Sequence, residues 1–163
     1  MPDLIIREAR LEDLPIVKEC MMSLYQSDRQ YDPLFYETHP EAQADEEYSM
    51  RIRGVDGVCF VAELEGEVIG CLTGALLVVP SEHPSRRTRL EKVFVKDGFR
   101  GLGAGSALVK AFIEWSREMG VSRVFVRAYA DNVEAIELYE RFGFRPYILG
   151  LAMAIEEEVP NQQ

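Results

Sequence analysis

Cysteine, histidine and long apolar runs are scarce in this chain of 163 residues, and each scarcity excludes a class of protein. The three cysteines are odd in number and show no C-x-x-C spacing, and there are two histidines. We therefore expect core thiols rather than disulfides or a metal site. No apolar run approaches the ~20 residues that a membrane-spanning helix needs, and the first residues are unlike a signal peptide. These absences predict a cytoplasmic protein without a membrane partner.

Positive charge is also in short supply. Lysine and arginine number 18 against 28 aspartate and glutamate residues, which gives a formal net charge of −10. Because a surface of this sign repels nucleic acid phosphates, no nucleic acid partner is expected. The same charge attracts protonated amines. An apolar content of 47% and the chain length fit one globular domain over residues 1–163.

The most informative segment is a glycine-rich turn between a β-rich run and an amphipathic helix, with the sequence LEKVFVKDGFRGLGAGSAL over residues 90–108. Gly101, Gly103 and Gly105 are expected to take positive φ and to let backbone N–H groups approach a ligand closely. The helix that follows adds the unbonded amides of its first turn and its positive dipole end. Arg100 supplies a forked cation. The segment predicts a diphosphate-binding turn, against the alternative of a turn without a ligand.

Three phosphate-binding motifs compete for these residues, and their spacing separates them. A Walker loop requires Lys and Ser/Thr where Ala104 and Gly105 stand, so it is excluded. A dinucleotide motif G-x-G-x-x-G can use Gly101 and Gly103 but meets Ser106 in place of its third glycine. An NAD(P)-binding oxidoreductase therefore stays open as a weaker alternative.

The third pattern is Arg/Gln-x-x-Gly-x-Gly/Ala, which Arg100, Gly103 and Gly105 match in full. Here the chain resembles the GNAT superfamily of acyl-CoA-dependent N-acyltransferases. A second segment, DNVEAIELYERFGF over residues 131–144, is similar to the family signature Asn-x-x-Ala-x-x-x-Tyr-x-x-x-Gly-Phe. The two motifs arrive in the order that the family has them.

The second segment is predicted to be a helix from its residues alone. Asp131 and Glu134 have capping-box spacing, and Gly143 is a typical helix stop after Phe142. Judged from this segment alone, Tyr139 lies at helical spacing and is predicted to be a buried aromatic of the core. The resemblance implies a different role, in which Tyr139 protonates the leaving thiolate.

The resemblance implies an α/β (α+β) fold with a central mixed, mostly antiparallel sheet of six to seven strands, about four flanking helices and a β-α-β core that binds acetyl-CoA. It implies that the strand before the glycine turn pairs with the pantetheine arm. The implied cofactor-binding residues are Val93, Phe94, Val95, Arg100, Gly101, Leu102, Gly103, Ala104, Gly105, Ser106, Asn132 and Ala135.

Glu91 is the candidate base. A protonated amine, with a pKa near ~10, must lose a proton before it attacks a thioester, so a carboxylate or a water chain is needed. Several family members place a base at this strand position. The alternative is an exposed strand residue paired with Lys92 or Arg89. His39 and His83 are reserve candidates.

The remaining elements are predicted from periodicity and turn residues. The expected strands cover residues 4–7, 58–64, 67–79, 122–128 and 147–155, the helices cover about 12–27 and 44–53, and a loop covers 80–87. Residues 28–37 are acidic and aromatic, which suits a small cationic substrate. The alternative is a substrate carboxylate or an acidic peptide held by Arg86, Arg87 and Arg89.

The predicted function is an N-acetyltransferase that moves the acetyl group of acetyl-CoA to a primary amine of a small molecule or peptide by direct attack on the thioester. A CoA-binding sensor without turnover remains an alternative. In related proteins the final strands often help to form a dimer, so a homodimer is expected. No metal is implied, and nothing in the sequence identifies the amine.

Overall fold

One sheet organises the computed structural model, which describes residues 3–33, 41–79 and 85–155. Its strands stand side by side in chain order: β1 (Leu4–Glu8), β2 (Gly57–Leu64), β3 (Glu67–Val79), β4 (Ser85–Val95) and β5 (Arg123–Val126). Neighbours from β1 to β4 are antiparallel, and β4 and β5 are parallel. The predicted mixed, mostly antiparallel sheet is confirmed, with five strands in the described residues rather than six to seven.

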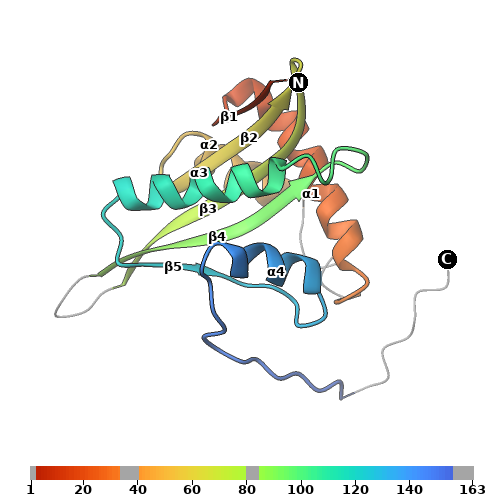
Figure 1. Cartoon of the computed structure of the whole chain (residues 1–163), viewed down its shortest axis with the longest axis vertical. Helices are drawn as coiled ribbons and strands as arrows, with labels where there is room; N and C mark the ends of the chain where they lie inside the picture. Colours follow the sequence, from red (N-terminus) through yellow and green to blue (C-terminus); the bar gives the residue numbers. More distant parts are fainter. Residues whose placement is uncertain (1–2, 34–40, 80–84, 156–163) are drawn as a thin grey trace.

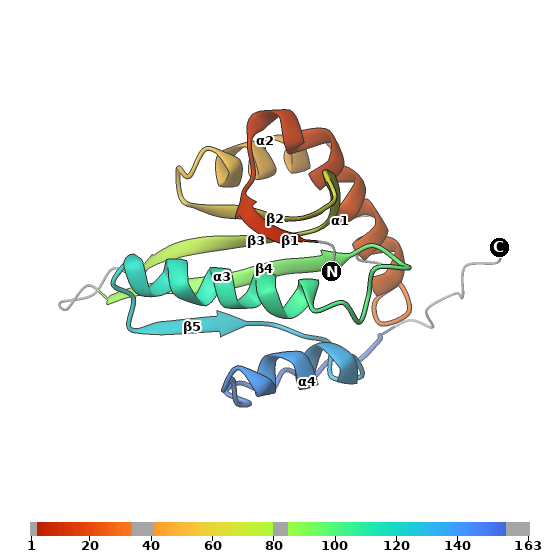
Figure 2. The ribbon, with the colours of Figure 1, turned by 45° about the horizontal axis from the view of Figure 1, so that its top comes forward.

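Helices cover both faces of this sheet (Figures 1 and 2). On one face lie α1 (Leu14–Asp28), which follows the 3-10 turn η1 (Leu11–Asp13), and α2 (Glu41–Ile52). On the other face α3 (Ala104–Glu118) crosses the strands, and α4 (Val133–Arg141) lies beside β5. Each face has its own apolar cluster of buried side chains. The arrangement agrees with the four flanking helices that were expected.

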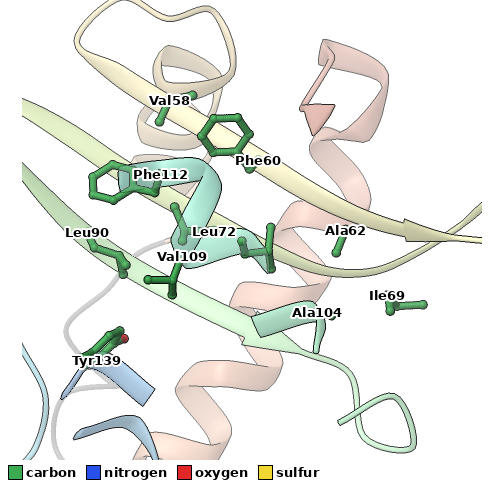
Figure 3. Close-up of a cluster of buried hydrophobic side chains, with 11 residues drawn as sticks. Val58, Phe60, Ala62, Ile69, Leu72, Leu90, Ala104, Val109, Phe112 and Tyr139 are labelled. Atoms are coloured by element: carbon green, nitrogen blue, oxygen red, sulfur yellow. The ribbon is translucent and has the colours of Figure 1, made fainter. Parts of the chain in front are cut away.

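The packing of α3 on the sheet depends on a glycine. A Cβ built on Gly74 of β3 would lie 2.1 Å from Cε2 of Phe112, so any larger residue there would displace the ring. Phe112 is fully buried among Leu72, Leu90 and Val109 (Figure 3). This close contact sets the distance between α3 and the strands, and with it the position of the glycine turn that begins α3.

The β2–β3 hairpin is confirmed at the predicted turn. Glu65 and Gly66 both have positive φ, 51° and 84°, which is the pattern of a tight hairpin turn. The predicted loop over residues 80–87 is wrong at its end, because β4 begins at Ser85. Antiparallel pairing with β3 overrides the polar composition there.

The final strand predicted over residues 147–155 is not formed. This segment leaves α4, runs away from the sheet (Figure 1) and exposes its apolar side chains, with Ile148 at 83% and Leu151 at 89%. Apolar residues alone do not make a strand, which also needs backbone pairing with a neighbouring edge, and this segment does not make that pairing. Within the described chain, the outer edge of β5 pairs with no strand.

Candidate active site

The site begins where β4 and β5 separate. The two strands pair only from Arg87 to Leu90 on β4. Directly after Leu90, the register of β4 against β3 also shifts, since Gly74 faces Leu90 while Thr73 faces Lys92. Glu91 is therefore the extra residue of a β-bulge, which places it and Lys92 toward the same sheet face. Sequence reasoning did not predict this bulge, which interrupts the strand alternation.

Beyond the bulge, the edge of β4 turned away from β3 is open. Lys96 N–H donates to the Ile69 carbonyl at 2.8 Å, so its backbone faces β3. Because backbone direction alternates along a strand, Phe94 also faces β3, whereas Val93 and Val95 face the open edge. Of the three residues expected to contact a pantetheine arm, Val93 thus has both backbone groups on this edge, and Val95 has its N–H there while its carbonyl accepts from Arg100. Phe94 has neither group there, and its side chain is buried on the α1/α2 face.

The glycine turn follows this edge, and its conformation is partly as predicted. Gly101 and Gly103 have φ of 79° and 85°, and nothing lies within 4 Å of a Cβ built on either. Gly105 was also expected at positive φ, but that is wrong, because it lies inside α3, which begins at Ala104. Any residue can adopt helical φ, so two of the three glycines of the motif have a left-handed backbone instead of the three predicted.

The amides of this turn lack hydrogen-bond acceptors within the described chain. Among the described residues, no backbone N–H from Arg100 to Ser106 donates a hydrogen bond to backbone or side chain, a stretch that includes Leu102 and Ala104. Gly103 caps α3 without a side chain that could accept from the first turn. Unbonded amides and the positive end of a helix dipole together form an anion-binding site. The geometry therefore fits a diphosphate.

Contacts around the turn bring the two sequence motifs together. A Cβ on Gly105 would lie 3.8 Å from Cδ2 of Leu138 and 3.9 Å from Cγ2 of Val95, so α3, α4 and the end of β4 meet there. The exposed Arg100 donates from Nε to the Val95 carbonyl at 3.3 Å and pairs with Asp97 at 3.4 Å. Its guanidinium stays at the mouth of the turn.

The N-cap of α4 is Asn132, not the predicted Asp131. Asn132 Oδ1 accepts from Ala135 N–H at 3.2 Å, which makes Asn132 the N-cap and leaves Glu134 outside a capping box. Ala135 is half-buried and packs against the apolar cluster between α3 and the sheet. Gly143 ends the helix with φ of 95°, as predicted.

Tyr139 projects from α4 into the edge of the α3 core (Figure 3). It is 7% exposed, and its ring meets Phe144 edge-on at 5.8 Å between centroids. Its hydroxyl has no hydrogen-bond partner among the described residues. Burial, and then the negative charge of Asp28, raise the pKa of Tyr139 to about 12. The phenol therefore stays protonated throughout the neutral pH range.

Glu91 is buried in an ion pair. Its two carboxylate oxygens accept from Nε and Nη2 of Arg51 at 2.9 and 3.1 Å, and Arg89 lies at 3.4 Å. The alternative of an exposed residue is therefore wrong, while pairing with Arg89 is present as a lesser contact. Burial by itself raises the pKa of Glu91, but the hydrogen bonds and charge of Arg51 outweigh it, so the pKa lies below its usual value.

The two predicted catalytic residues, Glu91 and Tyr139, interact with different helices. Glu91 joins Arg51 on α2, whereas Tyr139 lies within electrostatic reach of Asp28 at the end of α1. Arg51 was not identified from the sequence, because no short motif contains it, and Asp28 was identified only as part of the acidic segment 28–37. His39 and His83 lie outside the described residues.

Two further features of the described residues concern metals and membranes. No group of three or more His, Cys, Asp or Glu side chains is placed to hold a metal ion in the ranges that the structure covers. Among those same residues, no helix has both the length and the apolar character needed to span a bilayer. The three cysteines are free and buried, as predicted.

Comparisons with known proteins find N-acetyltransferases that are similar in sequence to this chain. An uncharacterized N-acetyltransferase of Methanocaldococcus jannaschii is 29% identical over 139 residues, which cover 85% of this chain and 59% of the relative. The spermine/spermidine N(1)-acetyltransferase of Bacillus subtilis is 29% identical over 83 residues, 50% of this chain and 55% of the relative. The chain thus spans less than two thirds of the length of these relatives.

Solved structures with the same fold include a variant of the BH1408 protein from Bacillus halodurans, with a TM-score of 0.81 and 17% identity over 93% of this chain and 99% of that one. The aminoglycoside N-acetyltransferase AAC(6')-Iy, solved in complex with CoA, has a TM-score of 0.74 and 17% identity over 94% of this chain and 95% of that one. The acetyltransferase (GNAT) family model matches residues 21–144, which contain the bulged strand, the glycine turn and α4. The chain therefore belongs to the acetyltransferase (GNAT) family.

Proposed function

We propose that the chain is an acetyl-CoA-dependent N-acetyltransferase that acetylates a primary amine of a small molecule or peptide by direct attack on the thioester. The observation that carries this proposal is the row of unbonded amides from Arg100 to Ser106, next to an open strand edge. Such a row fits a diphosphate, and the edge fits an extended amide chain. Both belong to coenzyme A. Membership of the family supports the same assignment.

Several backbone and side-chain groups of the site bind acetyl-CoA in this proposal. Amides of the glycine turn and of the first turn of α3 hold the diphosphate, with Arg100 as an added cation. The backbone groups of Val93 and the N–H of Val95, all on the open edge, pair with the pantetheine amides, and Asn132 and Ala135 adjoin the same arm. Bound acetyl-CoA supplies an activated acetyl carbonyl. A backbone amide of β4 polarises that carbonyl oxygen.

Two side chains move protons in this proposal. The Tyr139 hydroxyl donates to the departing thiolate. It has no partner in the described chain, and its raised pKa of about 12 keeps it protonated until the thiolate forms. Glu91 is the base. Because Arg51 occupies both of its oxygens, Glu91 acts through a chain of water rather than by direct contact with the amine. A cytoplasmic location and a homodimer complete the proposal.

The experiment that tests the function is thiol release from acetyl-CoA across a panel of primary amines and short peptides. We expect amine-dependent release with at least one acceptor. A thermal shift with CoA but no release with any amine contradicts catalysis and favours a sensor. A shift with NAD or NADP and none with CoA favours the oxidoreductase, since a ligand at a hundred times its Kd stabilises by about 2.7 kcal/mol.

Tyr139→Phe tests the proposed acid. The substitution removes only the hydroxyl, so the buried ring should still pack against Phe144. We expect kcat to fall about 10²- to 10⁴-fold, the usual range for a general acid, while CoA raises the melting temperature as in the wild type. Full turnover with intact CoA binding would remove Tyr139 from the mechanism.

A further inference from the structure

The end of α1 lies against the segment that joins β5 to α4, as both ribbon views show (Figures 1 and 2). Tyr31 stacks on Tyr129 with 5.3 Å between ring centroids and an interplanar angle of 22°. Tyr129 in turn accepts the Asn132 N–H on its carbonyl at 3.0 Å, at the start of α4. The stack therefore ties the chain after α1 to the helix that carries Tyr139.

Two carboxylates stand on this same turn of chain. The N–H groups of Tyr31 and Asp32 donate to the Asp28 carbonyl at 2.9 and 3.0 Å, which continues the helical turn past α1. Asp28 and Asp32 are four residues apart, so their side chains lie on one side of it. Both are half-buried, and burial raises the pKa of Asp28.

These carboxylates have no ion-pair partner among the described residues. Neither forms an ion pair within the part of the chain that the structure describes. Positive charge is nearby on Arg29, next in the chain, and on Arg127, whose charge reaches Tyr129. A half-buried carboxylate without a paired cation is unfavourable, and a bound cation relieves that cost.

The unpaired charge adjoins the proposed reaction centre. Burial and then the charges of Asp32 and Asp28 raise the pKa of Tyr129, and the charge of Asp28 also acts on Tyr139. Tyr139 is 7% exposed and its hydroxyl lacks a partner in the described chain. A group held by Asp28 therefore lies within electrostatic reach of the residue that is proposed to protonate the leaving thiolate.

Resting on the acetyl transfer proposed above, we infer that Asp28, Asp32 and the Tyr31–Tyr129 stack form the acceptor subsite, which takes a small primary amine with a second positive charge. The two carboxylates balance the two charges, and the tyrosine faces attract an ammonium group. One nitrogen loses its proton and reacts, while the other stays charged and fixes the orientation. A metal ion is a poorer occupant, because no third ligand residue is placed nearby in the described chain.

The test compares 1,4-diaminobutane with butan-1-amine as acceptors, with thiol release as the readout. For the wild type we expect KM for the diamine to be at least tenfold lower than for the monoamine. Asp28→Asn and Asp32→Asn should each raise the diamine KM at least tenfold and leave the KM for acetyl-CoA unchanged. Glu19→Gln is the matched control, because it removes one charge from the exposed side of α1. It should change neither amine KM.

Two outcomes separate the subsite from the function on which it rests. If the wild type acetylates amines but both asparagine variants keep the diamine KM and the preference for diamines, the subsite is wrong and the transferase stands. If none of the amines makes the wild type release thiol, the proposed function fails and the subsite falls with it. Melting curves with acetyl-CoA distinguish loss of the subsite from loss of folding, and Asp32→Asn gives a second variant should Asp28→Asn not fold.

Discussion

Glu91 and Arg51 form a pair in which each residue depends on the other. The Arg51 side chain is 10% exposed and that of Glu91 is 9% exposed, and Arg51 also contacts Asp56. A buried charge that loses its partner costs typically about 3–5 kcal/mol. Any substitution at Glu91 therefore changes stability as well as chemistry, and only a measurement that depends on proton transfer separates the two roles.

We expect Glu91→Gln to lower kcat/KM most strongly at the acid end of the pH–rate profile. At low pH the amine is mostly protonated and depends on a base, whereas near its own pKa of ~10 it needs less help. Wild-type Glu91 remains a carboxylate through this range, because its folded pKa is below its usual value. The measurement is thiol release from about pH 6 to about pH 10.

The stability of the same variant provides the control. A folded pKa below the unfolded one means that the ion pair stabilises fully above the unfolded pKa and loses this contribution as pH falls through the folded pKa. We therefore expect Glu91→Gln to destabilise at neutral pH and to matter less in acid. Loss of stability with an unchanged pH–rate curve would leave Glu91 as a structural partner and assign the base elsewhere.

At the scale of elements, the sequence predicted features whose signals are local. The glycine turn, the apolar face of α3 and the stop at Gly143 each depend on residues within a few positions of one another, and the structure has all three. The bulge at Glu91 could not be predicted, because it depends on the register of β4 against β3.

Long-range contacts also limited prediction of the site. The partner of Glu91 lies forty residues earlier in the chain, and the fold alone brings Asp28 within electrostatic reach of Tyr139. The choice between Asp131 and Asn132 as helix cap is a difference of one position, which composition does not resolve. Motifs thus identified where the site lies, and tertiary packing decided which side chains face one another.

The glycine turn offers a prediction with a close control. Gly103 precedes helix α3 and has a φ of 85°, and Gly120 follows the same helix and has a φ of 67°. Nothing lies within 4 Å of a Cβ built on either glycine. Alanine at either site costs roughly 1–2 kcal/mol for the left-handed backbone. We expect both variants to lose similar stability, but only Gly103→Ala to weaken CoA binding, by tenfold or more in a titration. Equal CoA affinity in the two variants would contradict a diphosphate at this turn.

At the scale of the whole molecule, the segment from Tyr147 to Ile155 has large apolar side chains that a single chain leaves exposed to solvent. Tyr147 contacts β5 through Phe125, at 5.5 Å between ring centroids, and through Arg123, whose guanidinium lies 5.2 Å from the Tyr147 ring. Leu149, Leu151 and the other large apolar residues of the segment are 80% exposed or more beyond Tyr147. An exposed apolar segment of this kind, which starts against a strand edge that is unpaired in the described chain, is typical of an association site.

We therefore expect the wild-type chain to sediment as a homodimer in which this segment is covered, and the double variant Leu149→Asp, Leu151→Asp to sediment as a monomer. Two buried charges per chain oppose association, because an aspartate removed from water without a partner is strongly unfavourable. Val55→Asp is the control, since Val55 is also exposed, at 64%, but follows α2 far along the chain from the segment. Both proteins should keep CoA binding, which depends on β4 and α3. A wild type that remains monomeric at every concentration in sedimentation velocity would leave the apolar segment without a role in self-association.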